Sequence, residues 1–286
     1  MKISEIIKSE NPVLSFEVFP PKSSEAYENI KSAALEIAAL KPDFMSVTYG
    51  AGGSTSTYTL DIAQSILATG VTPVAHLTCV HATNEKIREY LTQIKDKGIE
   101  NILALRGDLP AGVTAESLDF VHASDLVKEI KDFGGFCIGG ACYPEGHTES
   151  DSLTKDIENL KIKVDAGCEF LTTQMFFDND ILYNFLYKIR EAGITVPVIP
   201  GIMPVTNPVQ IKRSCALSGT VLPRRFLRLV DRFGDNPVAM KQAGIIYATE
   251  QIIDLYSNGI NAVHVYSMNK PDVAMQIQKN LEGIIG

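Results

Sequence analysis

Two carboxylates in unlike surroundings are the residues of this sequence best suited to chemistry. Glu17 lies inside the apolar run 16–19, whereas Asp108 follows Arg106 and Gly107 in a turn. Apolar surroundings disfavour an ionised carboxylate, so we expect a raised pKa at Glu17 and a role as general acid. Asp108 should stay ionised beside the guanidinium. Such a pair combines a proton donor with an electrostatic stabiliser.

These residues also have purely structural interpretations. A glutamate at a strand end is equally consistent with an ion pair to Lys22, and an aspartate after a glycine is typical of ordinary turns. His76 in AHLTC fits an acid or base, a hydrogen-bond donor or a core histidine, and it has no partner at metal-ligand spacing. We therefore expect no metal. Gln174 in LTTQMFFD fits the edge of a heteroaromatic ligand or a polar layer residue.

These side chains fall where predicted strands end. Apolar and β-branched runs predict eight strands, at residues 13–19, 44–50, 73–80, 101–105, 136–142, 169–175, 196–203 and 262–268. Apolar residues at helical spacing predict helices between and after them, at residues 26–40, 60–68, 84–97, 123–132, 153–166, 181–192, 208–217, 223–233, 237–258 and 273–281.

Eight strand-then-helix units predict a single α/β domain over residues 1–286. Strands joined by helical crossovers are parallel, and this number of units at this length favours a closed (β/α)8 TIM barrel. The helices within 218–258 are expected to be an insertion before strand eight. An open doubly wound sheet is the alternative, but neither GxGxxG nor GxxxxGK[ST] occurs. In a barrel the carboxyl ends of the strands form the active site.

The composition is that of an acidic globular protein. The 286 residues are 45% hydrophobic, and 26 Lys and Arg against 34 Asp and Glu give a net charge of −8. Without a basic stripe we expect no nucleic-acid partner. No apolar run reaches the roughly 18 residues that a membrane helix needs. Five cysteines without a disulfide or zinc pattern, and no secretory signal, predict a cytoplasmic protein.

Ordered motifs over nearly the whole chain carry a family resemblance. They are FEVFPPK (16–22), KPDFMSVTYGAGG (41–53), HLTC (76–79), LALRGDLP (103–110), ASDLV (123–127), YPEGH (143–147), LKIKVDAG (160–167), TQMFFD (173–178), IPGIMPVTN (199–207) and NK (269–270). The sequence resembles methylenetetrahydrofolate reductases of the short prokaryotic type. Several long motifs in one order are far more specific than any single motif.

The resemblance implies a flavoprotein of folate one-carbon metabolism and methionine biosynthesis. It implies a (β/α)8 barrel without a regulatory domain, holding non-covalent FAD at the carboxyl rim. In the implied ping-pong reaction NADH or NADPH reduces the flavin and leaves. 5,10-Methylenetetrahydrofolate then takes its place and accepts the hydride, which gives 5-methyltetrahydrofolate. The short type favours NADH, and family members form homo-oligomers.

The resemblance also assigns residues. It implies that Glu17 is the acid that helps open the five-membered ring of the folate, and that Asp108 stabilises the cationic intermediate near the flavin. The implied substrate contacts are Gln174, Gln210 and Lys270. The implied FAD contacts are Thr48, Tyr49, Ala51, His76, Arg106, Gly107, Asp108, Ala123, Tyr143, His147, Asp156, Asn159 and Lys163.

Three positions depart from the family pattern. Ile162 stands where relatives can carry a second basic residue beside Lys163, and Lys270 stands where an Arg fork is expected. The segment 211–217 lacks the Phe that some relatives place over the nicotinamide. The alternative functions are a flavin-free pterin-binding barrel, such as a folate-dependent methyltransferase, and a catalytically silent scaffold.

Overall fold

Parallel strands form a ring at the centre of the molecule. The computed structural model describes residues 1–286 except 22, 50–55, 81 and 109–118. The strands follow the order β7-β6-β5-β4-β3-β2-β1-β9-β8, and each neighbouring pair is parallel. Their bounds are β1 Val13–Val18, β2 Phe44–Val47, β3 Thr72–Thr78, β4 Asn101–Leu105, β5 Cys137–Cys142, β6 Phe170–Thr173, β7 Val198–Ile199, β8 Gly201–Ile202 and β9 Ala262–Tyr266.

The ring closes through one interrupted strand. β7 pairs with β6, β8 pairs with β9, and only Pro200 separates β7 from β8 along the chain. Proline has no N–H for a ladder, but its carbonyl still accepts a hydrogen bond from His264 N at 2.9 Å. The two segments therefore act as the seventh of eight strands. This arrangement confirms the predicted barrel.

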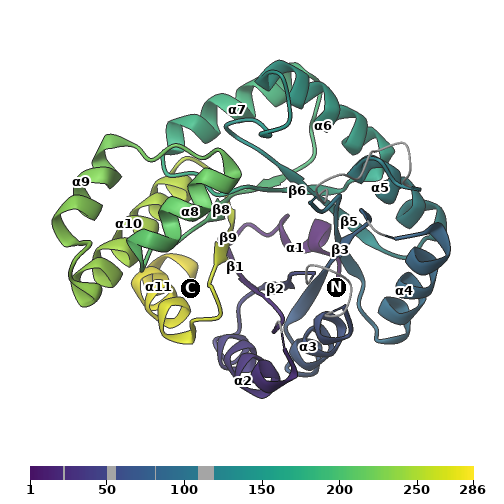
Figure 1. Ribbon diagram of the computed structural model, residues 1–286, viewed down its shortest axis with the longest axis horizontal. Helices are drawn as coiled ribbons and strands as arrows, with labels where there is room; N and C mark the ends of the chain where they lie inside the picture. Colours follow the sequence, from purple (N-terminus) through teal and green to yellow (C-terminus); the bar gives the residue numbers. More distant parts are fainter. Residues whose placement is uncertain (22, 50–55, 81, 109–118) are drawn as a thin grey trace.

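Helices surround the ring on its outer side (Figure 1). Their bounds are α2 Tyr27–Ala38, α3 Ser56–Ala68, α4 Asn84–Asp96, α5 Ala123–Phe133, α6 Leu153–Gly167, α7 Asn179–Glu191, α8 Pro208–Ser218, α9 Arg224–Phe233, α10 Pro237–Ser257 and α11 Pro271–Ile285, with a short 3₁₀ turn η1 at Ser24–Ala26. Three helices, α8 to α10, lie between β8 and β9 in the chain. The predicted insertion before the last strand is thus confirmed, with α9 projecting outward from α10 (Figure 1).

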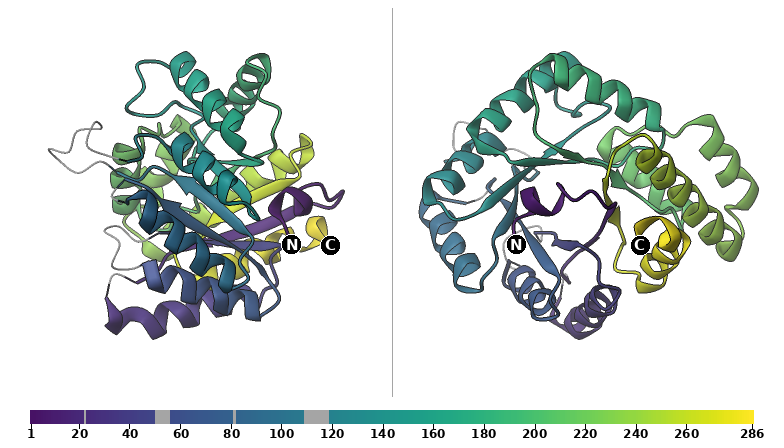
Figure 2. Two further views of the ribbon diagram at one scale, coloured as in Figure 1. Left: turned by 90° about the vertical axis from the view of Figure 1, so that its right-hand side faces the viewer. Right: turned by 180° about the vertical axis from the view of Figure 1, so that it is seen from behind.

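A short helix not predicted from the sequence, α1 (Ile3–Ile6), closes the amino end of the barrel. Ile3 is fully buried and packs with Val13, Phe44 and Ala262, the first residues of their strands. Its backbone N–H donates to Asn101 Oδ1 at 2.9 Å. The helix lies within the ring when the barrel is viewed along its axis (Figures 1 and 2). The open end of the barrel is therefore the carboxyl end.

The long helix α10 packs very closely on the loop after β8. A Cβ added at Gly244 would lie 1.8 Å from the backbone oxygen of Val205. Because a backbone carbonyl cannot rotate away like a side chain, the helix would have to shift.

We expect Gly244→Ala to lower the free energy of unfolding by about 3 kcal/mol. Gly283→Ala in α11 is the matched control, because nothing lies within 4 Å of its added Cβ. That control should leave stability unchanged or slightly higher. Chemical denaturation of both variants measures the difference, and equal stability would contradict the close packing.

Candidate functional site

Several polar side chains face the interior of the barrel toward its carboxyl end. Inward-facing residues alternate along each strand, which places Ser15 and Glu17 on β1, Ser46 on β2 and His264 on β9 toward the axis. Register matches pair Ser15 with His264 and Glu17 with Ser46. Ser15, Ser46 and His264 are each at most 3% exposed. An apolar barrel needs no such group.

These four residues form a continuous chain of contacts. Ser15 Oγ lies 2.8 Å from the Val263 carbonyl oxygen and 2.7 Å from His264 Nδ1. On its other side, His264 Nε2 lies 2.8 Å from Ser46 Oγ. Ser46 Oγ lies 3.4 Å from Glu17 Oε2. The chain therefore runs from a backbone carbonyl in the barrel interior to the carboxyl group of Glu17.

Burial changes the protonation of this cluster. It raises the pKa of Glu17 to about 8. Burial also lowers the pKa values of His76 and His264 to about 3. His76 Nε2 lies 3.6 Å from Glu17 Oε2 and has no hydrogen-bond partner among the described residues. Near neutral pH both imidazoles are neutral and Glu17 keeps its proton.

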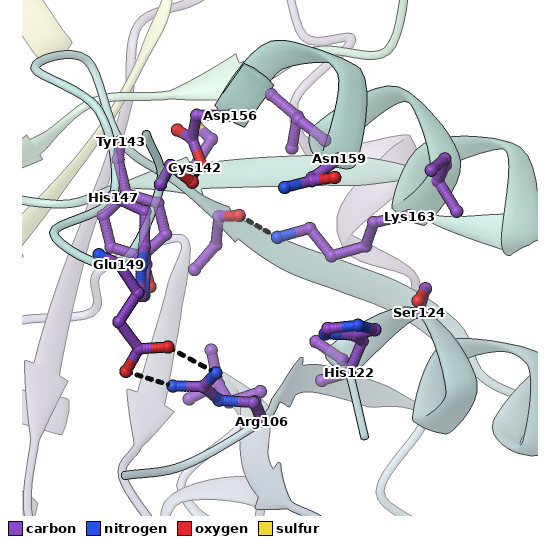
Figure 3. A pocket seen from close by; sticks show the side chains of 17 residues that line it. Arg106, His122, Ser124, Cys142, Tyr143, His147, Glu149, Asp156, Asn159 and Lys163 are labelled. Atoms are coloured by element: carbon purple, nitrogen blue, oxygen red, sulfur yellow. Dashed lines mark hydrogen bonds and ion pairs between the residues drawn. The ribbon is translucent and has the colours of Figure 1, made fainter. Parts of the chain in front are cut away.

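A cavity opens beside the carboxyl ends of β4 and β5. It encloses about 300 Å³. Figure 3 shows the side chains that surround it. Its lining comprises Ala104, Leu105, Arg106, His122, Ala123, Ser124, Ala141, Cys142, Tyr143, His147, Glu149, Ser150, Asp156, Asn159, Leu160, Ile162 and Lys163.

Helix α6 supplies one wall of the cavity. Asp156, Asn159 and Lys163 follow one another at spacings of three and four residues, which places them on one helical face. Ser152 caps the helix by accepting a hydrogen bond from Lys155 N at 3.2 Å. Ser150 Oγ donates to Asp156 Oδ1 at 3.2 Å. The capped helix thereby fixes three polar groups toward one space.

Two cationic side chains line the cavity, and they differ in their hydrogen-bond partners. Arg106 makes two hydrogen bonds to Glu149, at 2.6 and 2.7 Å, and this contact raises its pKa. Lys163 Nζ donates to the carbonyl oxygen of Ala141 (Figure 3). Burial lowers the pKa of Lys163, and no carboxylate within the described part of the chain lies at ion-pair distance from it. A buried cation without a counter-ion favours an anionic ligand.

The cavity gathers seven of the thirteen residues that the resemblance assigned to the cofactor, namely Arg106, Ala123, Tyr143, His147, Asp156, Asn159 and Lys163. Five others do not line the cavity and lie at or just beyond the ends of β2, β3 and β4, namely Thr48, Tyr49, His76, Gly107 and Asp108. Asp108 is exposed. Ala51 and Lys22 lie outside the described residues.

The predicted substrate contacts lie on the neighbouring side of the rim. Gln174 follows β6, and its Oε1 accepts a hydrogen bond from Met175 N at 2.9 Å. Lys270 Nζ donates to Thr206 Oγ1 at 2.6 Å, which ties the segment after β9 to the loop before α8. Gln210 is exposed in the first turn of α8. Lys270 and the loop before α8 are thus neighbours, whereas Gln174 lies after β6.

Several functional candidates were not predicted from the sequence. Glu149 pairs with Arg106, and Ser15, Ser46 and His264 lie beneath Glu17. The last three carried a usable signal, because a polar residue at every second position of a buried strand indicates an interior polar layer. Glu149 carried none, since its contact depends on how the loop after β5 folds.

The described residues hold neither a cluster of metal-binding side chains nor a membrane-spanning helix. Among the described residues no group of three or more His, Cys, Asp or Glu side chains is arranged to hold a metal ion. Within the same residues no helix is long and apolar enough to cross a membrane. All five cysteines are buried and free.

Comparisons with known proteins agree with the residue pattern. The family model "Methylenetetrahydrofolate reductase" matches residues 2–282. A 5,10-methylenetetrahydrofolate reductase of Escherichia coli (strain K12) is 36% identical, over 92% of this chain and 88% of that protein. A probable methylenetetrahydrofolate reductase (NADH) of Oryza sativa subsp. japonica is 37% identical over 98% of this chain, which spans half the length of that relative.

Solved structures share the fold at low identity. An uncharacterised protein from Clostridium thermocellum that binds two copies of 5-methyl-5,6,7,8-tetrahydrofolic acid superimposes with a TM-score of 0.65 at 16% identity. The match covers 99% of this chain and 100% of that one. A 2,3-dimethylmalate lyase gives 0.56 at 9% identity, covering 99% and 86%. With the family model covering nearly all of its residues, the chain belongs to the methylenetetrahydrofolate reductase family.

Proposed function

We propose that this protein reduces 5,10-methylenetetrahydrofolate to 5-methyltetrahydrofolate with hydride from NADH or NADPH, using bound FAD in a ping-pong sequence. Family membership supports an oxidoreductase that acts on this folate. The observation that carries the chemistry is Glu17, a carboxyl group held protonated inside the open end of the barrel.

The residues of the cavity fit a dinucleotide flavin. When bound, FAD carries the hydride between the two substrates. Lys163 and Arg106 offer two cations to a diphosphate, and Asp156 and Asn159 offer groups that can bind ribityl or ribose hydroxyls. The buried ammonium of Lys163, which lacks a carboxylate partner in the described structure, supports an anion there.

Glu17 supplies the proton. The side chain is 20% exposed, so a ligand at the rim can reach its carboxyl group. Protonation of a nitrogen of the folate imidazolidine ring by Glu17 would weaken a C–N bond and generate the cationic iminium that accepts hydride. Asp108 would stabilise that positive charge, and the Gln174 amide would bind the edge of the pterin or nicotinamide ring. Gln210 and Lys270 would contact the substrate farther along the rim.

Product formation tests this proposal. Purified protein supplied with FAD, NADH and 5,10-methylenetetrahydrofolate should form 5-methyltetrahydrofolate, identified by mass. Plant relatives carry NADH in their names, and this supports NADH over NADPH as the hydride donor of this protein. Product without any flavin requirement would instead indicate a flavin-free pterin enzyme. A homo-oligomeric state and a cytoplasmic location stay predictions, which light scattering and cell fractionation test.

The pair between Arg106 and Glu149 makes a separate prediction. Glu149 occupies both donors of the Arg106 fork that a diphosphate would need. Glu149→Gln removes the competing charge, so we expect FAD to bind several-fold more tightly.

The cost in stability should be below about 1 kcal/mol, because Glu149 is 53% exposed. Fluorescence titration of the apoprotein with FAD measures the affinity. Glu158→Gln, which breaks an exposed pair with Lys155, is the control. Weaker FAD binding in Glu149→Gln would show that Glu149 supports the cofactor site instead of competing for it.

A further inference from the structure

The hydrogen bonds of the interior chain below Glu17 run in one donor-to-acceptor direction, and this direction affects whether Glu17 is protonated. This inference rests on the proposed function of Glu17. A serine hydroxyl has one proton, a neutral imidazole has one N–H, and a backbone carbonyl only accepts. For a neutral imidazole, and with the Ser15 proton donated to the Val263 carbonyl, these counts leave one arrangement along Ser15, His264 and Ser46.

The count starts at the carbonyl of Val263. Ser15 Oγ lies 2.8 Å from that oxygen, so the Ser15 proton is used there. Ser15 Oγ is also 2.7 Å from His264 Nδ1, and with its own proton committed it must accept. His264 therefore carries its proton on Nδ1. The imidazole is neutral because burial lowers its pKa to about 3.

The count continues toward Glu17. With the proton on Nδ1, His264 Nε2 is a bare acceptor, and Ser46 Oγ at 2.8 Å must donate to it. Ser46 then has no proton left for Glu17 Oε2, which lies 3.4 Å away. An ionised Glu17 would face an oxygen lone pair. A protonated Glu17 can donate to Ser46 Oγ and complete the chain.

We propose that Ser15, His264 and Ser46 are positioning residues that hold Glu17 protonated through a one-way hydrogen-bond chain anchored at the Val263 carbonyl. No other titratable group facing Glu17 within the described residues supplies a proton in its place. His264 and Tyr266 come from β9, and His76 comes from β3. Tyr266 Oη donates to the Thr173 carbonyl at 2.5 Å, and His76 Nε2 at 3.6 Å is beyond ordinary hydrogen-bond range.

The chain predicts that its far end controls the acid. Ser15→Ala removes the acceptor for His264 Nδ1–H, so the imidazole can move its proton to Nε2. His264 would then donate to Ser46, and Ser46 would donate to the carboxylate of Glu17. A donor to the carboxylate favours ionisation, so the pH midpoint of the folate half-reaction should fall by about one unit.

Two measurements test the proposal on the FAD-loaded protein. The first is the ¹⁵N spectrum of histidine-labelled protein, with the His264 signals assigned through His264→Gln. A proton on Nδ1 in the wild type supports the chain, and a proton on Nε2 or on both nitrogens overturns it. The second is the pH profile of flavin reoxidation by 5,10-methylenetetrahydrofolate in Ser15→Ala. A lower midpoint supports the chain, and an unchanged or higher midpoint overturns it.

Control variants distinguish an effect of the hydrogen-bond chain from a folding defect and from loss of the acid role of Glu17. Thr249→Val removes a buried hydroxyl from α10, outside the barrel interior, and should keep the wild-type midpoint. Ser15→Thr restores a hydroxyl and should restore the midpoint. Failure of Glu17→Gln to affect the folate half-reaction would remove the acid role. If Glu17→Gln abolishes that half-reaction while Ser15→Ala keeps the wild-type midpoint, only the one-way chain fails.

Discussion

Glu17→Gln should separate the two half-reactions. We expect the folate half-reaction to slow by about 10²- to 10⁴-fold, because glutamine keeps the shape of the acid but cannot give up its proton in the same way. Reduction of the flavin by NADH needs no such proton and should stay within a few-fold of the wild type. Anaerobic stopped-flow absorbance of the flavin measures both rates.

The pH dependence of the folate half-reaction is an independent test of Glu17 as the acid. The pKa of Glu17 is raised to about 8, so the acid is present below that pH and is lost above it. The wild-type folate half-reaction should fall about tenfold per pH unit above pH 8, whereas the residual rate of Glu17→Gln should show no such fall.

Glu89→Gln, on the exposed face of α4, is the matched control and should change neither rate. Equal loss of both half-reactions in Glu17→Gln would mean that Glu17 maintains the site and does not act as the acid.

Lys163→Met should have opposite effects on binding and on stability. Loss of the cation should weaken FAD binding by about 10- to 100-fold, which is the range expected for a charge-assisted hydrogen bond. The apoprotein should become more stable, because a buried ammonium, whose one acceptor among the described residues is a carbonyl, is replaced by an apolar chain of similar length. Titration with FAD and denaturation of the apoprotein measure the two effects.

Lys161→Met is the control on the same helix. Lys161 pairs with Asp165 on α6 and is not in the lining of the cavity. Its removal should leave FAD affinity unchanged. If Lys163→Met binds FAD as tightly as the wild type, the cavity beside α6 does not hold the diphosphate.

Much of the fold is encoded locally and was therefore predictable. Buried strands read as short apolar runs, and helices read as apolar residues at spacings of three and four, so the order of the barrel followed from the sequence. Details set by tertiary contacts were not predictable. Helix α1 has only four residues and forms because Ile3 fills the end of the barrel. The break at Pro200 is tolerated because the carbonyl still bonds to β9.

The candidate site divides in the same way. Glu17 stood out because a carboxylate within an apolar run is unusual, and its raised pKa follows from that burial. His264 carries only the signal of a polar residue facing the barrel interior, because the closed ring alone brings β9 beside β1 and sets its imidazole between Ser15 and Ser46. Contacts that depend on ring closure cannot be found from spacing within one strand.

Anaerobic absorbance of the bound flavin tests the account most directly. Protein loaded with FAD should be yellow, lose its colour when NADH is added without oxygen, and regain it when 5,10-methylenetetrahydrofolate follows. Protein that takes up no FAD, or whose flavin stays reduced after the folate is added, would contradict the account.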